Sequence, residues 1–169
     1  TTGTDAGADG DGGTDTATGI ENIYGSAFDD ELTGEAGANK LIGGAGDDIL
    51  IGKAGDDQFV GGLGSDTVSY DGEAADVVAN LNDGNATVGT TETDSFSGIE
   101  NLIGGEGDDT LTGDGGDNIL QGGEGDDHLF GGSGDDILEG GEGIDEIDGE
   151  AGTDIASYQH DTAGVDVTV

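Results

Sequence analysis

The chain has 169 residues, of which 39 are Gly, and its 40 Asp plus Glu stand against only 2 Lys plus Arg. A formal net charge of -38 repels nucleic acid phosphates and anionic membrane surfaces, so both are excluded as partners. The sequence has no Cys, which excludes disulfides and thiolate metal sites, and no stretch approaches the roughly 20 apolar residues of a membrane span.

Residues 1–18 come first and resemble the tail of a linker or capping segment, because Asp15 precedes Gly19 by the same spacing as Asp94 precedes Gly98. The sequence Gly-Ile-Glu-Asn that begins at Gly19 returns at Gly98, which defines a long period in the chain. We therefore expect the chain to be a slice from a longer array of such units.

A nine-residue repeat fills two runs, one within residues 19–69 and one within residues 98–157. Each repeat opens with Gly, has Gly at position four except at Phe28, has Asp or Asn at position six, and is apolar at position eight, most weakly at Ala156. The eleven repeats begin at Gly25, Gly34, Gly43, Gly52, Gly61, Gly104, Gly113, Gly122, Gly131, Gly140 and Gly149.

The spacing within the repeat predicts a turn followed by a very short strand. Alternating glycines suit a turn that needs positive φ and close approach of backbones. The three residues after the acid suit a strand with one inward side chain. The absence of Pro agrees, since stacked strands use their N–H groups in the ladder. The repeat therefore predicts an all-β fold.

Residues 70–97 separate the two runs, and Asp83-Gly84 gives a hairpin turn signal between two alternating stretches. Tyr70 opens this segment, and Tyr158 opens its incomplete counterpart at residues 158–169. We expect capping strands and a linker hairpin at 70–97, and the start of a second capping segment at 158–169. Each Tyr is expected to cover the open end of its run.

The pattern Gly-Gly-x-Gly-x-Asp-x-apolar-x resembles the RTX, or haemolysin-type calcium-binding, repeat over nearly all of residues 19–158. The resemblance implies a parallel β-roll in which two repeats make one right-handed turn of about 18 residues, with calcium between neighbouring turns along each edge. It implies two such rolls in tandem, at 19–69 and 98–157. It also implies a secreted or cell-surface protein, because RTX proteins are typically exported through type I secretion.

The resemblance also implies a ligand set for each ion. One repeat contributes the carbonyls of positions two and four and its acid; the next repeat but one along the chain contributes the carbonyls of positions one and three and its own acid. Two weaker pairings, Glu21 with Asn39 and Glu100 with Asn118, involve blocks that leave the frame. The seven predicted sites are Ser26, Phe28, Asp30, Gly43, Ala45 and Asp48; Glu35, Gly37, Asn39, Gly52, Ala54 and Asp57; Gly44, Gly46, Asp48, Gly61, Leu63 and Asp66; Gly105, Gly107, Asp109, Gly122, Glu124 and Asp127; Asp114, Gly116, Asn118, Gly131, Ser133 and Asp136; Gly123, Gly125, Asp127, Gly140, Glu142 and Asp145; and Gly132, Gly134, Asp136, Gly149, Ala151 and Asp154.

This pairing gives the acids unequal weight. Asp48, Asp127 and Asp136 each serve two sites, whereas Asp66 and Asp154 each serve one. Replacing Asp48 by Ala is therefore expected to remove more calcium than replacing Asp66 by Ala.

The ligand chemistry indicates calcium independently of the resemblance. Carboxylate and carbonyl oxygens select Ca²⁺ or Mg²⁺ over transition metals, and Mg²⁺ gives up its waters reluctantly. Single inward side chains bury little apolar surface against the backbone entropy that folding costs. We therefore predict a chain that is disordered without Ca²⁺ and folds on binding it.

These features predict a non-catalytic, calcium-binding structural module of a larger secreted bacterial protein, with calcium and the flanking domains of the parent chain as its partners. The long period favours an adhesin or surface-layer protein. The alternative is a C-terminal module of a secreted protease, lipase or polysaccharide epimerase.

Competing interpretations are weaker. A disordered polyanion does not demand an apolar residue two places after each acid. His160 lies near Ser157 and Asp161, yet adjacent positions rarely give triad geometry and no nucleophile elbow precedes them. Asp9-Gly10-Asp11 begins like an EF-hand loop but lacks the later ligands. We expect no enzyme.

Overall fold

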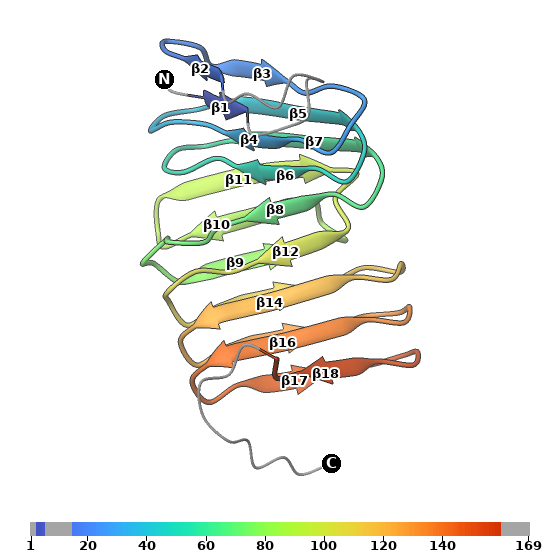
Figure 1. The fold of residues 1–169 in the computed structure, drawn as a ribbon. Helices are drawn as coiled ribbons and strands as arrows, with labels where there is room; N and C mark the ends of the chain where they lie inside the picture. The colour runs from blue at the N-terminus through green and yellow to red at the C-terminus, as the bar shows by residue number, and fades with distance from the viewer. Residues whose placement is uncertain (1–2, 6–14, 160–169) are drawn as a thin grey trace.

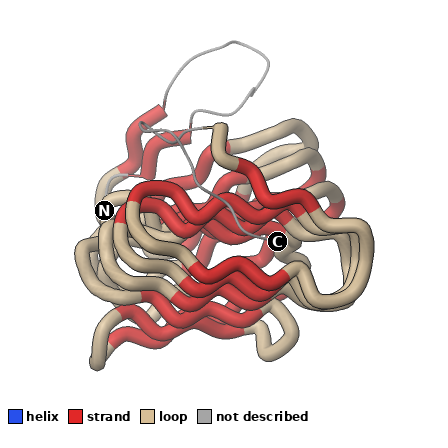
Figure 2. Tube along the Cα trace, turned by 90° about the horizontal axis from the view of Figure 1, so that it is seen from below, coloured by secondary structure: helices blue, strands red, loops and turns tan. Residues whose placement is uncertain are grey.

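The computed structural model describes residues 3–5 and 15–159. All regular secondary structure in these residues is β-strand, which confirms the all-β class. The strands form two nine-stranded layers with turns along both edges (Figures 1 and 2). No helix in these ranges is long and apolar enough to cross a membrane. Most of the predicted segments 1–18 and 158–169, with His160 and Asp161, lies outside the described residues.

The two sheets take alternate strands of the repeat runs. The first sheet contains, in spatial order, β18 (Ile155–Ser157), β16 (Ile137–Glu142), β14 (Ile119–Glu124), β12 (Asn101–Ile103), β8 (Thr67–Ser69), β6 (Ile49–Ile51), β4 (Glu31–Thr33), β1 (Gly3–Asp5) and β2 (Asp15–Ala17). The second contains β17 (Glu146–Asp148), β15 (His128–Phe130), β13 (Thr110–Thr112), β9 (Val77–Asn80), β10 (Asn85–Val88), β11 (Glu92–Ser97), β7 (Gln58–Leu63), β5 (Lys40–Ala45) and β3 (Asn22–Tyr24).

Within each run, neighbouring strands are parallel and equivalent residues lie side by side. Leu32 pairs with Leu50 in the first sheet, and Leu41 pairs with Phe59 in the second. Because successive repeats go to opposite sheets, two repeats make one turn. This register confirms the parallel β-roll and its period of about 18 residues.

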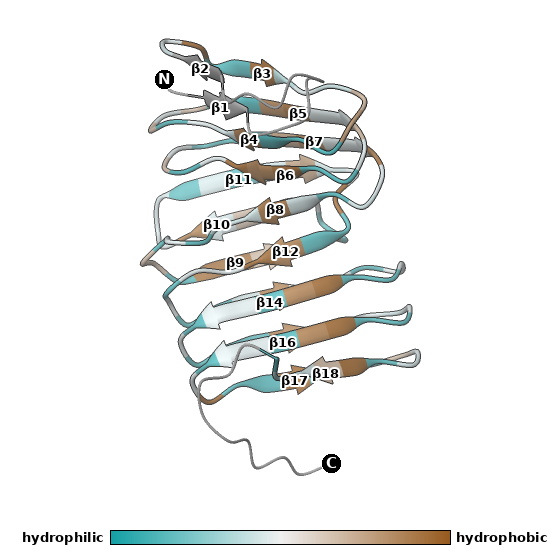
Figure 3. Cartoon of the chain, viewed as in Figure 1, coloured by the Kyte–Doolittle hydropathy of each residue, from teal (hydrophilic) through white to brown (hydrophobic). Residues whose placement is uncertain are grey.

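The core is a row of position-eight side chains between the sheets. Strand alternation turns this residue inward and its two neighbours outward. Hydrophobic colour is accordingly concentrated in the strands (Figure 3). The members that are at most 1% exposed are Leu32, Leu41, Leu50, Phe59, Val68, Leu111, Leu120, Leu129 and Leu138. Ile147 is partly buried and Ala156, in the last described strand, is exposed.

The turns stack as closely as the strands, and glycine permits this. Gly44 and Gly46 have φ values of 124° and 116°, a region that L side chains rarely adopt. A methyl group on Gly44 would overlap the Ser26 carbonyl oxygen, and one on Gly46 would overlap the Phe28 backbone. The turns of neighbouring rungs therefore pack backbone against backbone.

Residues 70–97 lie inside the roll and join the two runs. In the first sheet β8 pairs directly with β12, with Val68 beside Leu102. In the second sheet β9, β10 and β11 form an antiparallel meander between β13 and β7. The meander contains the hairpin at Asp83-Gly84, and its outer strands β11 and β9 are parallel to β7 and β13. Both sheets are therefore continuous across the junction.

This continuity refines the expectation of two separately closed rolls. Tyr70 is only 4% exposed, and its hydroxyl donates to Asp94 Oδ2 at 3.0 Å. It belongs to the interior and covers no open end, because the second run continues the sheets beyond it. The 70–97 segment completes rungs of the second sheet while the first sheet passes directly from one run to the next.

Candidate metal-binding sites

The position-six residues form a ladder along each edge, which we name the inner ladder. Each lies immediately before a strand, and in seven of the eleven the side-chain Oδ1 accepts the backbone N–H of the position-six residue one turn earlier. All seven pairs expected from the sequence are brought together in this way. The N–H···Oδ1 distances are 2.8 Å for Asp30 to Asp48, 2.7 Å for Asn39 to Asp57, 2.9 Å for Asp48 to Asp66, 2.8 Å for Asp109 to Asp127, 2.8 Å for Asn118 to Asp136, 3.0 Å for Asp127 to Asp145 and 3.1 Å for Asp136 to Asp154.

The second oxygen of these carboxylates has a different environment. Buried polar atoms in proteins almost always have a hydrogen-bond partner. Five inner-ladder Oδ2 atoms are buried and have none, namely those of Asp48, Asp57, Asp66, Asp127 and Asp136. An acceptor that is removed from water and left without a donor is strongly unfavourable unless a cation contacts it.

The unpartnered Oδ2 of Asp127 points over Gly122, the position-one glycine of its own repeat, where a carbonyl of the next turn also arrives. A methyl group on Gly122 would overlap Asp127 Oδ2 and lie against the Gly140 carbonyl oxygen. The same convergence occurs at Gly131, between Asp136 Oδ2 and the Gly149 carbonyl. Carboxylate and carbonyl oxygens thus share a space that any side chain would fill. Hard oxygens in a flexible turn are the ligands that Ca²⁺ prefers.

The other predicted carbonyl ligands lie in the same stacked turns. The position-three carbonyls of Leu63 and Glu142 accept the N–H groups of Gly46 and Gly125, at 2.8 and 2.9 Å. A carbonyl oxygen has two lone pairs, so one such hydrogen bond leaves a site for a cation. Among the described residues, no three Asp, Glu or His side chains gather at one point. A cation here would therefore depend largely on backbone oxygens.

The inner ladder concentrates negative charge in a dry place. Burial raises the pKa of Asp57 and Asp127 from the ordinary 3.8 to about 7, and that of Asp66 to about 6. Neighbouring carboxylates raise these pKa values further, while a backbone N–H donor opposes the rise. The pKa values of Asp48 and Asp136 are raised for the same reason, chiefly burial. A divalent cation would relieve both the desolvation and the repulsion.

Of the two weaker sequence pairings, Glu100 with Asn118 makes a direct contact, while in the other it is Lys40, the residue after Asn39, that contacts Glu21. Asn118 Nδ2 donates to the backbone carbonyl of Glu100 at 2.8 Å, and the N–H of Lys40 donates to the carbonyl of Glu21 at 2.7 Å. The structure thus brings Glu100 near Asn118, but through the main chain of Glu100.

A second ladder, made by position-five acids, was missed by sequence reasoning; we name it the outer ladder. In these exposed contacts, the Oδ1 of each acid accepts the backbone N–H of the position-five residue one turn later. In the inner ladder, by contrast, Oδ1 accepts the N–H of the residue one turn earlier. The outer-ladder distances are 2.9 Å for Asp47 to Asp29, 2.8 Å for Ser65 to Asp47, 3.0 Å for Asp126 to Asp108, 2.8 Å for Asp135 to Asp117, 2.8 Å for Ile144 to Asp126 and 2.9 Å for Thr153 to Asp135.

The sequence does contain a signal for the outer ladder. Position five is Asp in most repeats, and it is Ser65, Ile144 or Thr153 in repeats that have no next repeat but one in their run. Ala38 is the one other exception. The Gly52 repeat also has no next repeat but one in its run, but it keeps Asp56, whose Oδ1 accepts the N–H of Thr93 from the inserted segment at 2.9 Å. An outer acid is thus found where a later rung supplies a donor.

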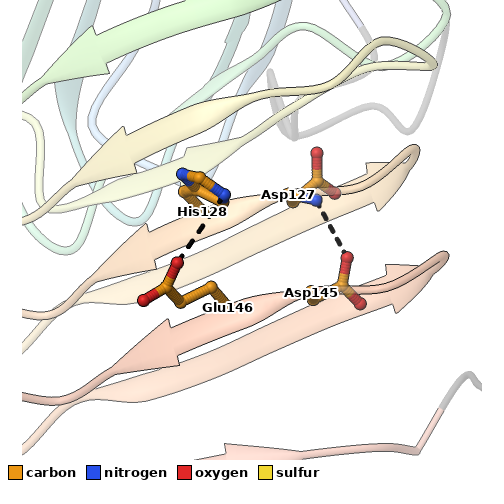
Figure 4. A network of polar contacts seen from close by, with 4 residues as sticks. All are labelled: Asp127, His128, Asp145 and Glu146. Atoms are coloured by element: carbon orange, nitrogen blue, oxygen red, sulfur yellow. Dashed lines mark hydrogen bonds and ion pairs between the residues drawn. The ribbon is translucent and has the colours of Figure 1, made fainter.

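One residue past the inner ladder, side chains face solvent. His128 Nε2 lies 3.7 Å from Glu146 Oε2, beside the rung in which Asp127 donates its N–H to Asp145 (Figure 4). Both side chains of the pair are exposed, at 55% and 69%. This agrees with the outward orientation of position seven.

Comparison with known proteins agrees with this geometry. The family model for the RTX calcium-binding nonapeptide repeat matches the chain in four copies, at residues 15–50, 33–68, 94–129 and 130–157. These matches span both repeat runs and extend into the 70–97 segment. No curated protein sequence matches the chain.

Proposed function

The chain belongs to the RTX calcium-binding nonapeptide repeat family, and from that premise we propose that its inner ladders bind calcium at the seven paired positions and that these ions drive folding. The observation that carries the proposal is the set of buried, unpartnered Oδ2 atoms. The spaces beside Gly122 and Gly131 show how such an oxygen meets a carbonyl of the next turn. The ligands are the position-six residues and turn carbonyls inferred from the repeat.

The reason for calcium-driven folding is electrostatic. Stacking the turns places carboxylates in rows a single rung apart, and burial removes the water that would screen them. The hydrophobic row between the sheets is one side chain deep, so it offers little to offset that repulsion. Calcium supplies the opposing charge only where its concentration is high. Extracellular calcium modules bind at roughly 10⁻⁴ to 10⁻³ M, well above cytoplasmic levels.

RTX repeats typically occur in secreted proteins, and this chain fits that setting. In our proposal it stays unfolded at low calcium and folds in calcium-rich surroundings as a structural module of a larger secreted protein. A place in an adhesin or surface-layer protein is supported by the continuous junction, which lets runs follow one another in one roll. A non-catalytic module of a secreted enzyme is the second candidate, because the family model alone fits it equally well.

Far-UV circular dichroism during a calcium titration tests the proposal. A coil spectrum without calcium should change to a β spectrum as calcium rises to ~10 mM, above the expected affinities. Magnesium at the same concentrations is the control and should leave the coil spectrum, because Mg²⁺ retains its waters. A spectrum that calcium does not alter would contradict calcium-driven folding.

A further inference from the structure

The last acid of the first run has an unused oxygen. Asp66 is fully buried, and its Oδ2 has no hydrogen-bond partner. The repeat period pairs Asp66 only with Asp48 of the preceding turn, and no repeat stands one turn further on. The repeat period therefore provides no ligands on the following turn with which Asp66 Oδ2 could share a cation.

Residues outside the nine-residue repeats supply ligands at this place. The N–H of Asp66 donates to Glu100 Oε2 at 2.9 Å, the contact that each inner-ladder acid makes with the next acid along its edge. The N–H of Asn101 donates to the Asp66 carbonyl at 2.9 Å, just as that of Ile49 does to the Asp30 carbonyl at 2.8 Å. Glu100 thus occupies the next rung of the ladder, although it lies 34 positions on in the sequence.

The neighbouring turn is also equivalent to a regular one. A methyl group on Gly61 would overlap both Asp66 Oδ2 and the carbonyl oxygen of Gly98. Gly98, with φ of 61°, lies over Gly62, so its carbonyl takes the place that a position-one carbonyl has in other turns. The space beside Gly61 is therefore lined by carboxylate and carbonyl oxygens.

The register at this junction is firmly held. Asn101 Nδ2 donates to Ser65 Oγ at 3.0 Å, and Asn101 Oδ1 accepts the N–H of Ile119 at 3.0 Å. One side chain thus ties the last rung of the first run to the second run. This contact keeps Glu100 over Asp66.

The opposite edge of the junction differs. Asp57 donates its N–H to Asp94 Oδ1 at 2.8 Å, but Asp94 Oδ2 accepts the Tyr70 hydroxyl. Beside Gly52, the nearest atoms after Asp57 Oδ2 belong to the Phe59 ring and not to a carbonyl. The oxygen-lined space is therefore found on the Asp66 edge of the junction.

We propose that Asp66, Glu100 and the Gly98 carbonyl form an eighth calcium site, which joins the two repeat runs. The inference rests on the proposed function, because it assigns the same ion to a place outside the repeat. In this proposal Asp66 is a ligand of two ions, as Asp48 is, and no longer of one. Asp154 remains an acid that serves one.

Counting bound calcium by native mass spectrometry at saturation tests the site. Glu100→Ala, which removes the side-chain oxygens, should bind one ion fewer than the unsubstituted chain. The control Glu106→Ala removes the same side chain from an exposed turn nearby and should leave the count unchanged. Asp66→Ala should lose two ions and Asp154→Ala one. Equal counts for Glu100→Ala and the unsubstituted chain, with calcium-driven folding intact, would overturn the junction site alone.

If Glu100→Ala does not fold, anomalous scattering from crystals of the calcium-loaded unsubstituted chain decides the matter. An ion between Asp66 and Glu100 supports the junction site, and ions at the paired positions with none there overturn it while leaving the proposed function standing. A chain that binds no calcium overturns both.

Discussion

The inner and outer ladders run side by side, one residue apart in sequence, and use the same side chain differently. Asp127 of the inner ladder is fully buried and its Oδ2 has no partner, whereas Asp126 of the outer ladder has an Oδ1 that accepts the Ile144 N–H in an exposed contact. Both residues lie in the turn before β15, and one step along the chain takes the carboxylate from solvent to the interior. Burial with an unused oxygen, and not the presence of an acid, therefore marks the candidate cation site.

Removing one acid from each ladder should give the largest contrast. Asp127→Ala deletes a ligand of two predicted ions and leaves the buried Asp109 N–H without its acceptor. We expect the loss of two ions and, at a hundredfold excess of calcium over Kd, about 5 kcal/mol of unfolding free energy. Chemical denaturation in calcium, with parallel ion counting, measures both quantities.

The matched control is Asp126→Ala. It removes an exposed acceptor whose N–H partner can hydrogen-bond to water instead. The unfolding free energy should therefore fall by about 1 kcal/mol or less, with no change in the number of bound calcium ions. Similar losses from both variants would remove the distinction between the ladders.

The glycine that lines an inner-ladder site gives the next effect. Gly122→Ala places a methyl group on Asp127 Oδ2 and against the Gly140 carbonyl. We expect the loss of one ion and a fall of about 3 kcal/mol in the unfolding free energy measured in the presence of calcium. Gly115→Ala is the control, since no atom lies within 4 Å of the added methyl group, and it should change stability by less than about 0.5 kcal/mol. Full calcium binding by Gly122→Ala would refute the proposed ligand space.

Acidification should weaken calcium binding through the inner ladder. The folded pKa values of Asp57 and Asp127, about 7, lie above the unfolded value near 3.8, so the metal-free folded state takes up protons that the unfolded state releases. The metal-free fold is therefore most stable below about pH 4 and loses stability as pH rises through about 7.

Calcium reverses this dependence because it competes with those protons. We expect the calcium midpoint of folding to rise about tenfold or more between about pH 7.5 and about pH 5.5, as judged by circular dichroism titrations at the two pH values. A midpoint that does not depend on pH would mean that the buried carboxylates are not the ligands.

The exposed pair beyond the ladders should matter least. His128→Ala removes a contact at 3.7 Å between side chains that face solvent. Exposed ion pairs contribute about 0–1 kcal/mol, so we expect a change of about 0.5 kcal/mol or less and the same calcium count. A loss of calcium in this variant would show that the ion sites extend beyond the inner ladder.

Much of this architecture could be predicted from the repeat. Its period places Asp30 beside Asp48 and Leu32 beside Leu50, because stacked turns of equal length bring equivalent residues together. The outer ladder was not predicted because an acid at position five, taken alone, is typical of a solvated surface residue. Its hydrogen bonds to the next turn show its structural use.

The junction could not be predicted from periodicity. The contact between Asp66 and Glu100 crosses the inserted segment and depends on how the chain returns after those strands. The sequence likewise predicts that Tyr70 covers the open end of its run, yet the sheets continue past it and bury it. Where the repeat breaks, placement is decided by strand pairing in three dimensions, here between β8 and β12.

Crystallography of the calcium-loaded chain, with anomalous scattering at a wavelength where calcium contributes, tests the central claim most directly. Our account predicts ions between successive turns, each against an inner-ladder side-chain oxygen (Oδ2 of an Asp, Oδ1 of Asn39 or Asn118) and a position-one carbonyl of the next turn, and one between Asp66 and Glu100. Ions bound instead to the exposed outer-ladder acids, with the inner Oδ2 atoms uncoordinated, would contradict it.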